Sequence, residues 1–328
     1  MKVLVLTNMY PSAEKPASGT FVQEQVEALR KEGIDIDVFL VDGSEHKINY
    51  LWGIFRFWGH LLKHRYDLIH AHYVFSGLIA RTQFLYPIVL THHGPEFWSW
   101  QFTPCKIITP LVNKVILVSP EMDERLKYKK AIIIPCGIDF DLFRPMPREE
   151  ARKKLNLPMD KKLVLWAGHY QRPEKRFDIV KAAVAIAREK DPSIELVLVT
   201  KQPHDVIPTY MNACDALLLV SDAEGSPMVV KEAMACNLPV ISVRVGDVPE
   251  VIGGTEGCYL CTQEPADVAK KLALALSQPR RTNGRENIKH LEQGAIARRI
   301  KEVYQGVVKK RTAKKDIGRT VITQRSEE

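Results

Sequence analysis

The 328-residue chain lacks long hydrophobic runs, close cysteine clusters and a glycine fingerprint after its first strand-like segment. No apolar stretch approaches the roughly 20 residues that a helix needs to cross a bilayer. The segment after residues 3–7 reads Asn8-Met9-Tyr10-Pro11, which disfavours a Rossmann dehydrogenase. The apolar segment at the start of the chain is too short for a signal-peptide core. We therefore expect a cytoplasmic protein, either free or at the inner face of the membrane.

Cysteine is sparse and scattered. Of the six cysteines only Cys258 and Cys261 lie close together, and no second ligand pair accompanies them. We therefore expect reduced thiols that act as small buried hydrophobes. The sequence predicts no metal and no other cofactor.

The composition is that of a globular protein, with 45% hydrophobic and 26% charged residues. The length favours two domains. Half of the formal charge of +8 lies in residues 309–328, where seven Lys or Arg face three Asp or Glu, a net +4. We predict a mobile basic tail there, able to contact anionic lipid. Nucleic acid is disfavoured because no recognition motif accompanies the charge.

Apolar segments alternate with helical patterns in two series, which indicates α/β architecture with two doubly wound parallel sheets. Ligands of such sheets bind beyond the carboxyl ends of the strands, so we expect the chemistry in a cleft between two facing sheets. The expected strands are residues 3–7, 35–41, 67–72, 88–91 and 114–118 in the first series and 163–167, 195–200, 216–220 and 239–243 in the second.

The segment 221–235 carries two glutamates, Glu224 and Glu232, across a predicted loop-to-helix junction. Pro227 is favourable as a first helical residue, so the helix is expected to open at Ser226. Free backbone N–H groups and the helix dipole at such an end attract a diphosphate. A carboxylate one turn into the helix can accept hydrogen bonds from ribose hydroxyls. Taken alone, the two glutamates are more simply interpreted as solvated acids on a surface helix.

The glutamate pair, together with the Pro- and Gly-punctuated connector 132–145, resembles the retaining family 4 glycosyltransferases of GT-B fold. The resemblance implies two Rossmann-like domains facing each other across a cleft, an acceptor-side domain at 1–138 and a donor-binding domain at 139–308. It covers nearly the whole chain. It also implies a metal-independent transfer in which the leaving diphosphate takes the acceptor proton.

Residue by residue, the resemblance implies that Glu224 contacts the transferred sugar and that Glu232 binds the donor ribose. The backbone of the intervening turn would hold the donor phosphates, through Gly225, Ser226, Pro227, Met228 and Val229. Lys175 matches the family's diphosphate lysine. The arginine that usually follows the glycine is replaced by His169, and Arg172 is the alternative cation.

On the facing domain, Gly19 matches the family's glycine-bearing loop after the first strand. His93 matches a histidine at a strand end that contacts the donor sugar, so His93, Glu224 and Lys175 are the predicted catalytic residues. His72, which shares a strand face with His70, is predicted on the acceptor side. For both of these histidines a structural hydrogen-bonding role is an open alternative.

Residues 51–65 form an aromatic and basic segment without an acid. Two interpretations stay open: a helix that meets a membrane surface with Trp58, Arg56 and Lys63, and a helix that faces the core. The resemblance implies transfer of a sugar from a nucleotide sugar to a glycan or lipid-linked acceptor in polysaccharide or glycolipid synthesis. The alternatives are a nucleotide-sugar epimerase and a non-catalytic carbohydrate-binding protein on the same scaffold.

Overall fold

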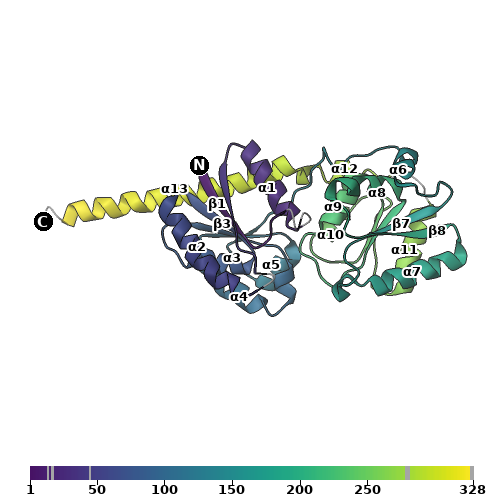
Figure 1. Ribbon diagram of the computed structural model, residues 1–328, viewed down its shortest axis with the longest axis horizontal. Helices are drawn as coiled ribbons and strands as arrows, with labels where there is room; N and C mark the ends of the chain where they lie inside the picture. Colours follow the sequence, from purple (N-terminus) through teal and green to yellow (C-terminus); the bar gives the residue numbers. More distant parts are fainter. Residues whose placement is uncertain (13–14, 16–17, 44–45, 278–280, 326–328) are drawn as a thin grey trace.

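The computed structural model describes residues 1–12, 15, 18–43, 46–277 and 281–325, with side chains as far as Arg311. It has two lobes, each built on a parallel sheet with helices on both faces (Figure 1). The first sheet has the strand order β2-β1-β3-β4-β5-β6. Its strands are β1 (Lys2–Thr7), β2 (Asp35–Leu40), β3 (Leu68–His72), β4 (Ile88–His92), β5 (Lys114–Leu117) and β6 (Ala131–Ile133). Its helices are α1 (Thr20–Lys31), α2 (Asn49–Lys63), α3 (Val74–Arg81), α4 (Phe102–Ile108) and α5 (Pro120–Leu126), with the 3-10 turns η1 (Pro95–Trp98) and η2 (Thr109–Leu111).

The second sheet has the order β11-β10-β9-β7-β8. Its strands are β7 (Lys162–Ala167), β8 (Ile194–Val199), β9 (Ala216–Leu219), β10 (Val240–Ser242) and β11 (Tyr259–Leu260). The helices are α6 (Arg148–Leu155), α7 (Phe177–Lys190), α8 (Ile207–Ala213), α9 (Met228–Ala235), α10 (Val248–Ile252), α11 (Pro265–Ser277) and α12 (Gly284–Asn287), with η3 (Pro173–Lys175), η4 (His204–Val206) and η5 (Lys289–Leu291). The fold predicted from the sequence, two doubly wound sheets of GT-B type, is confirmed.

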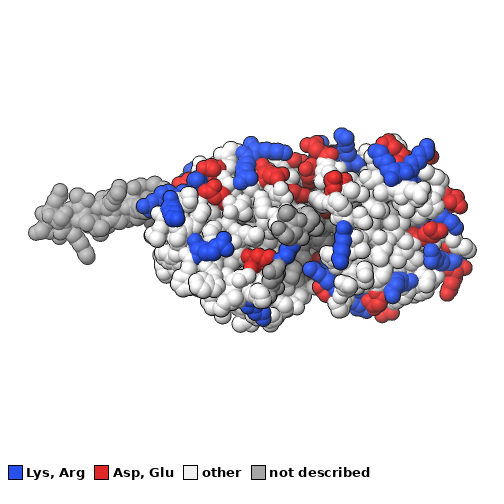
Figure 2. All heavy atoms as spheres, in the orientation of Figure 1, with Lys and Arg blue, Asp and Glu red and all other residues white. Residues whose placement is uncertain are grey.

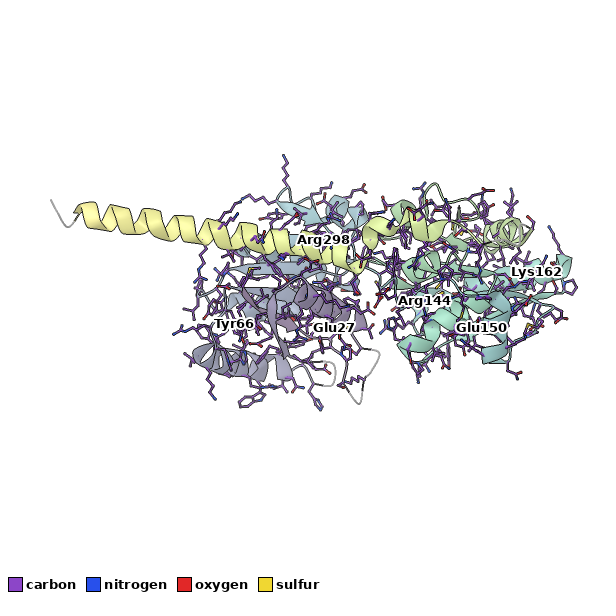
Figure 3. All side chains as sticks on the ribbon, turned by 90° about the horizontal axis from the view of Figure 1, so that it is seen from above. Glu27, Tyr66, Arg144, Glu150, Lys162 and Arg298 are labelled. Atoms are coloured by element: carbon purple, nitrogen blue, oxygen red, sulfur yellow. The ribbon has the colours of Figure 1, made fainter. Side chains whose placement is uncertain are left out.

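The last helix, α13 (Gln293–Arg325), returns from the second lobe to the first and packs on α1. Figure 3 shows it crossing the lobe that carries Tyr66 and Glu27, away from Arg144 and Lys162 of the second lobe. Its buried Tyr304 reaches the first sheet. The segment from residue 293 to residue 308, placed by the sequence in the second domain, therefore lies on the first lobe.

α13 also carries the C-terminal segment that the sequence predicts as a mobile tail. Arg298 and Lys301 of this helix lie 3.1 Å and 3.8 Å from the carboxylate of Glu32 at the end of α1. From residue 309 the backbone continues as helix as far as Arg325. Residues 309–325 are thus the end of one long helix.

Most predicted strands agree with the structure to within a residue or two. Two short edge strands were not predicted, β6 inside the expected connector and β11 near the end of the second series. The helix after Glu224 begins at Met228, and Pro227 precedes it in an extended conformation, so the predicted start at Ser226 was too early. No helix in the described part of the chain is both long and apolar enough to cross a membrane.

Candidate active site

The backbones of the two lobes meet at Gly94 of the first lobe and Gly225 of the second. A Cβ atom at Gly225, in the loop after β9, would lie 1.9 Å from the carbonyl oxygen of His93, which follows β4. A Cβ atom at Gly94 would lie 2.5 Å from the Cα of Gly225. Within the second lobe, a Cβ atom at Gly246 would lie 2.4 Å from the carbonyl oxygen of Gly225. Any side chain at Gly225 would therefore force the lobes apart. The close approach of the loops that carry His93 and Glu224 therefore depends on Gly94 and Gly225.

Lys175 and Glu224 form the central ion pair of the second lobe. Lys175 Nζ donates to Glu224 Oε1 at 2.6 Å, and the two side chains are 25% and 14% exposed. The loops that carry them are joined by the backbone N–H of Asp222, which donates to the carbonyl of Glu174 at 2.8 Å. The sequence predicted both residues, and the structure brings them together.

Further cations surround this pair. Burial lowers the pKa of His169, and the positive charges of Arg172, Lys201 and Lys175 lower it further, so the His169 ring is neutral at pH 7. The positive charge of Arg172 also lowers the pKa of the Tyr73 phenol in the other lobe, although burial raises this pKa more strongly. On the face in Figure 2, basic side chains lie on both sides of the boundary between the lobes. The group of cations suits a diphosphate, and Arg172, not His169, carries the charge.

His93 lies at the centre of the first-lobe side. Its ring packs against Phe21 and Tyr73, with centroids 4.9 Å and 4.7 Å away, and Nε2 shares a hydrogen bond of 2.9 Å with Nδ1 of His72. Burial holds the pKa of His93 well below its usual range, so the ring is neutral. Nδ1 of His93 is buried and has no hydrogen-bond partner among the described residues.

His72 and His70 lie behind this ring. Both are completely buried, and burial lowers the pKa of His72 to about 3. His72 touches His93 and is positioned to orient it. His70 shares hydrogen bonds with Tyr304 of α13 at 2.6 Å and with Thr91 at 2.7 Å, which gives it the structural role left open by the sequence.

The turn between Glu224 and α9 is fixed by a buried network. The Ser226 hydroxyl donates to Asp247 Oδ2 at 2.7 Å and also contacts Lys231 Nζ, which lies 2.8 Å from the same carboxylate oxygen. Lys231 Nζ donates to the carbonyl of Cys136 in the connector at 2.9 Å. The Ser226 side chain is thus structural. The first amides of α9, at Met228 and Val229, have no acceptor within the helix because they lie in its first turn.

Gly19 precedes α1 with a φ of +70°, and a Cβ there would lie 2.6 Å from the carbonyl oxygen of Met9. This conformation requires glycine. Residues 13–14 and 16–17 of the same predicted loop lie outside the described residues.

Glu232 is linked to the first lobe through His204. Its Oε1 lies 3.4 Å from His204 Nε2, while His204 Nδ1 lies 3.4 Å from Glu24 Oε1 on α1. Burial raises the pKa of Glu24 to about 7. The hydrogen bond to Glu232 is the largest of the effects that raise the pKa of His204. His204 thus links Glu232, the predicted ribose ligand of the second lobe, to Glu24 of the first lobe.

Sequence reasoning missed Tyr73, Lys201, His204 and Glu24. Tyr73 and Lys201 follow the carboxyl ends of β3 and β8, with φ values of 68° and 55° that are unusual for side-chain-bearing residues. Their positions after strands were the available signal. No sequence pattern pairs Glu24 with His204, because the two come from different lobes. Among the residues that the structure describes, no group of three or more His, Cys, Asp or Glu could hold a metal ion.

Two family models match this chain, one in each lobe. The model for Glycosyltransferase Family 4 matches residues 18–142, and the model for Glycosyl transferases group 1 matches residues 198–291. TuaC of Bacillus subtilis (strain 168), whose name assigns it to teichuronic acid biosynthesis as a glycosyltransferase, is 28% identical over 326 aligned positions, 77% of this chain and 83% of its own length.

Solved structures agree in fold. The sucrose-phosphate synthase of Thermosynechococcus elongatus superimposes with a TM-score of 0.77 at 22% identity, over 94% of this chain and 99% of its own. HepE of Anabaena gives a TM-score of 0.71 at 18% identity, over 93% of this chain and 100% of its own. With family models in both lobes and the same two-lobed architecture, this chain belongs to the family 4 glycosyltransferases of GT-B fold.

Proposed function

We propose that the protein is a retaining glycosyltransferase that moves a sugar from a nucleoside-diphosphate sugar to a glycan or lipid-linked acceptor. One observation carries the proposal: Glu224, which is paired with Lys175, lies in the second-lobe loop that touches His93 and Gly94 of the first lobe. A sugar bound at this contact would meet a carboxylate, a cation and a neutral imidazole at once.

The donor side is supported by the cations. Lys175 and Arg172, with Lys201 nearby, would neutralise charge that develops on the leaving diphosphate, an effect worth roughly a few kcal/mol in a dry site. The free amides of Met228 and Val229 add donors without charge. HepE, the fold relative, has been solved with UDP and with UDP and glucose, which supports a nucleoside diphosphate as donor.

In the proposed reaction the residues of this chain position the substrates and stabilise the charge that develops on the diphosphate. None of them is needed as a dedicated base. Glu224 and the Nδ1 of His93 would bind hydroxyls of the transferred sugar, and Glu232 would bind the ribose. The leaving diphosphate would take the acceptor proton on the face from which the acceptor attacks, which retains the anomeric configuration. On this account the transfer is independent of metal ions.

The test combines a donor screen with variants of the glutamate pair. Thermal shift with a panel of nucleotide sugars identifies the donor. With that donor we expect Glu232→Ala to raise KM about tenfold or more, and Glu224→Ala to lower kcat about a hundredfold with little change in KM. Glu174→Ala, in an exposed position of the Lys175 loop, is the matched control and should behave as wild type.

The outcomes separate the candidate functions. Wild-type activity in both glutamate variants would remove the site assignment. A changed sugar without any acceptor would identify an epimerase, and donor binding without turnover would identify a binding protein. Proton NMR of the product gives its anomeric configuration and decides whether the transfer retains the configuration of the donor sugar.

We also propose that the acceptor is reached at a membrane surface on the cytoplasmic side, in the synthesis of a cell-surface polysaccharide or glycolipid. Support comes from α2, whose outer face exposes Leu51, Trp52, Phe55 and Leu62 at 57%, 64%, 70% and 79%. Arg56 and Lys63 are exposed on the same helix. The name of TuaC, which places that relative in teichuronic acid synthesis, fits this proposal.

The inner face of α2 packs on the core, as one of the two interpretations of residues 51–65 expects, so the proposed membrane contact concerns the outer face alone. Phe57 and Leu61 are buried, and a Cβ at Gly53 would lie 2.4 Å from a methyl group of Val41. Trp58, expected at the membrane, instead donates its indole N–H to Thr82 at 3.1 Å. The residues to test are therefore Trp52 and Phe55.

Trp52→Ser/Phe55→Ser should lose most of its co-sedimentation with vesicles that contain anionic lipid, since it removes two exposed aromatic rings. Met159→Ser/Leu274→Ser removes comparable exposed apolar groups from the second lobe and should sediment as wild type. Equal sedimentation of wild type and both variants would refute the contact.

A further inference from the structure

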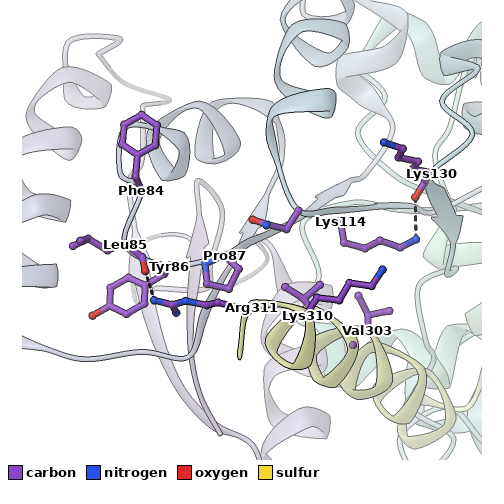
Figure 4. A pocket seen from close by; sticks show the side chains of 12 residues that line it. Phe84, Leu85, Tyr86, Pro87, Lys114, Lys130, Val303, Lys310 and Arg311 are labelled. Atoms are coloured by element: carbon purple, nitrogen blue, oxygen red, sulfur yellow. Dashed lines mark hydrogen bonds between the residues drawn. The ribbon is translucent and has the colours of Figure 1, made fainter. Parts of the chain in front are cut away.

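A pocket of about 800 Å³ lies between the first lobe and α13 (Figure 4). Its walls are residues 84–87, which precede β4, residues 113–114 at the start of β5, and the side of α13 from Val303 to Arg311. The strands are parallel, and their carboxyl ends point to the candidate active site. The pocket therefore lies at the opposite edge of the sheet, and we call it the far-edge pocket.

The far-edge pocket is strongly cationic. Four of its lining residues are basic, namely Lys114, Lys130, Lys310 and Arg311, and none is acidic. In the part of the chain that the structure describes, none of the four takes part in a salt bridge. Their unneutralised charge at one small site favours an anionic ligand.

The hydrogen bonds that these cations do make go to uncharged groups. Lys114 Nζ donates to the carbonyl of Lys130 at 2.9 Å, and Arg311 donates to the carbonyls of Leu85 at 2.5 Å and Asp67 at 3.4 Å. Such bonds orient the cations but leave their charge in place. An ammonium and a guanidinium each have further N–H donors to offer to a ligand.

Two of the cations also repel each other. Burial lowers the pKa of Lys114, and the positive charge of Lys310 lowers it further. In Figure 4 the side chain of Lys310 extends from α13 toward that of Lys114. Two like charges held close are unfavourable, and an anion between them would turn the repulsion into attraction.

The rest of the wall is apolar. Tyr86, Pro87 and Val307 line the interior, and Arg311 lies over the Tyr86 ring at 5.7 Å from its centroid. At the rim Phe84 and Leu85 are 80% and 46% exposed. The volume is within the range of about 300–1,000 Å³ for small-molecule sites. A ligand that fits would be anionic at one end and less polar at the other.

We propose that the far-edge pocket is a second ligand site, which binds a phosphate group between Lys114, Lys310 and Arg311. A phosphate carries up to two negative charges and several acceptor oxygens, and lysine and arginine both bind it well. The phosphate can belong to a soluble compound or to the head group of an anionic phospholipid. The site is separate from the proposed transferase reaction and does not depend on it.

The test uses the full chain and hydrogen–deuterium exchange, because peptides from the two sites report separately in one sample. Inorganic pyrophosphate is titrated at fixed ionic strength, and vesicles of phosphatidylglycerol are compared with vesicles of phosphatidylcholine. We expect protection of residues 84–87, 113–114 and 303–311, apart from any protection around Lys175. Lys114→Gln/Lys310→Gln should raise the concentration for half-maximal protection about tenfold or more.

Two comparisons keep the test decisive. Lys153→Gln/Lys154→Gln removes the same charge from exposed positions on α6 and should bind as wild type. Lys310→Gln alone changes only an exposed side chain, so it should fold normally and still weaken binding. Protection by pyrophosphate identifies a soluble phosphate ligand, and protection by phosphatidylglycerol vesicles alone identifies a lipid head group. No protection of the far-edge peptides by either probe, or equal protection in the double variant, overturns the proposal.

Discussion

Glu24 offers a direct test of the bridge between the lobes. Its carboxylate lies 3.4 Å from His204 Nδ1, and burial raises its pKa from 4.5 to about 7. Between these two values the folded protein keeps a proton that the unfolded chain has lost. The stabilisation by this proton is complete below pH 4.5 and is lost as the pH rises through 7. Glu24→Gln keeps the shape of the protonated side chain and removes its titration.

The size of the effect follows from the pKa. Each pKa unit corresponds to about 1.4 kcal/mol, so a pKa of about 7 in place of 4.5 corresponds to up to about 3 kcal/mol. Glu232, Asp139 and Glu27 raise the pKa of Glu24 by their negative charge, and His204 lowers it. His204 keeps its hydrogen bond to Glu232 in the variant, so part of the pH dependence of stability persists.

The assay is denaturant unfolding at pH values from 5 to 8. We expect Glu24→Gln to match wild type near pH 5 and to be more stable at pH 8, by up to about 3 kcal/mol. Glu189→Gln makes the same chemical change at an exposed position of α7, away from Glu24, and should follow the wild-type profile. Parallel profiles for Glu24→Gln and wild type, or a less stable variant at pH 8, would show that the reasoning is wrong.

Three further variants test other contacts. Gly225→Ala, whose new Cβ would lie 1.9 Å from a carbonyl oxygen of the other lobe, should separate the lobes and lower kcat/KM at least tenfold with little loss of thermal stability; wild-type kinetics would contradict this. Lys231→Met leaves the buried Asp247 carboxylate without its cation and should cost about 3 kcal/mol in denaturant unfolding. Tyr304→Phe removes a buried hydrogen bond of 2.6 Å to a histidine of β3 and should cost about 1 kcal/mol, so an unchanged unfolding midpoint would show that the bond contributes nothing.

Much of the fold could be predicted because apolar periodicity marks buried strands directly. The edge strands β6 and β11 were missed because only two or three residues form each, too few for a pattern. The path of α13 was missed for another reason. Its apolar stripe shows that it packs, but not on which lobe, and Tyr304 finds its partner 234 positions earlier in the chain.

The candidate site also contains residues that the sequence predicted and residues that it did not. Lys175 and Glu224 were predicted from the resemblance to the family 4 glycosyltransferases, in loops that each follow a strand of one sheet, and the structure brings the two side chains together. Trp58 was misplaced because helical spacing gives the two faces of α2 but not which one the protein covers. His204 was invisible because its role depends on the distance between lobes, which no local pattern encodes. The donor base, the sugar and the acceptor could not be predicted either, because the pockets that select them are built from loops that these motifs do not specify.

The return of α13 to the first lobe bears on how such enzymes can be recombined. The first lobe is completed by residues from both ends of the chain, so a swap at the connector alone would pair its core with a foreign helix. The new helix would have to offer a partner for His70 and cations for Glu32, as Tyr304 and Arg298 do here. A chimera that exchanges acceptor specificity should therefore carry residues 1–133 together with residues from 293 onward, leaving the donor lobe as the contiguous insert.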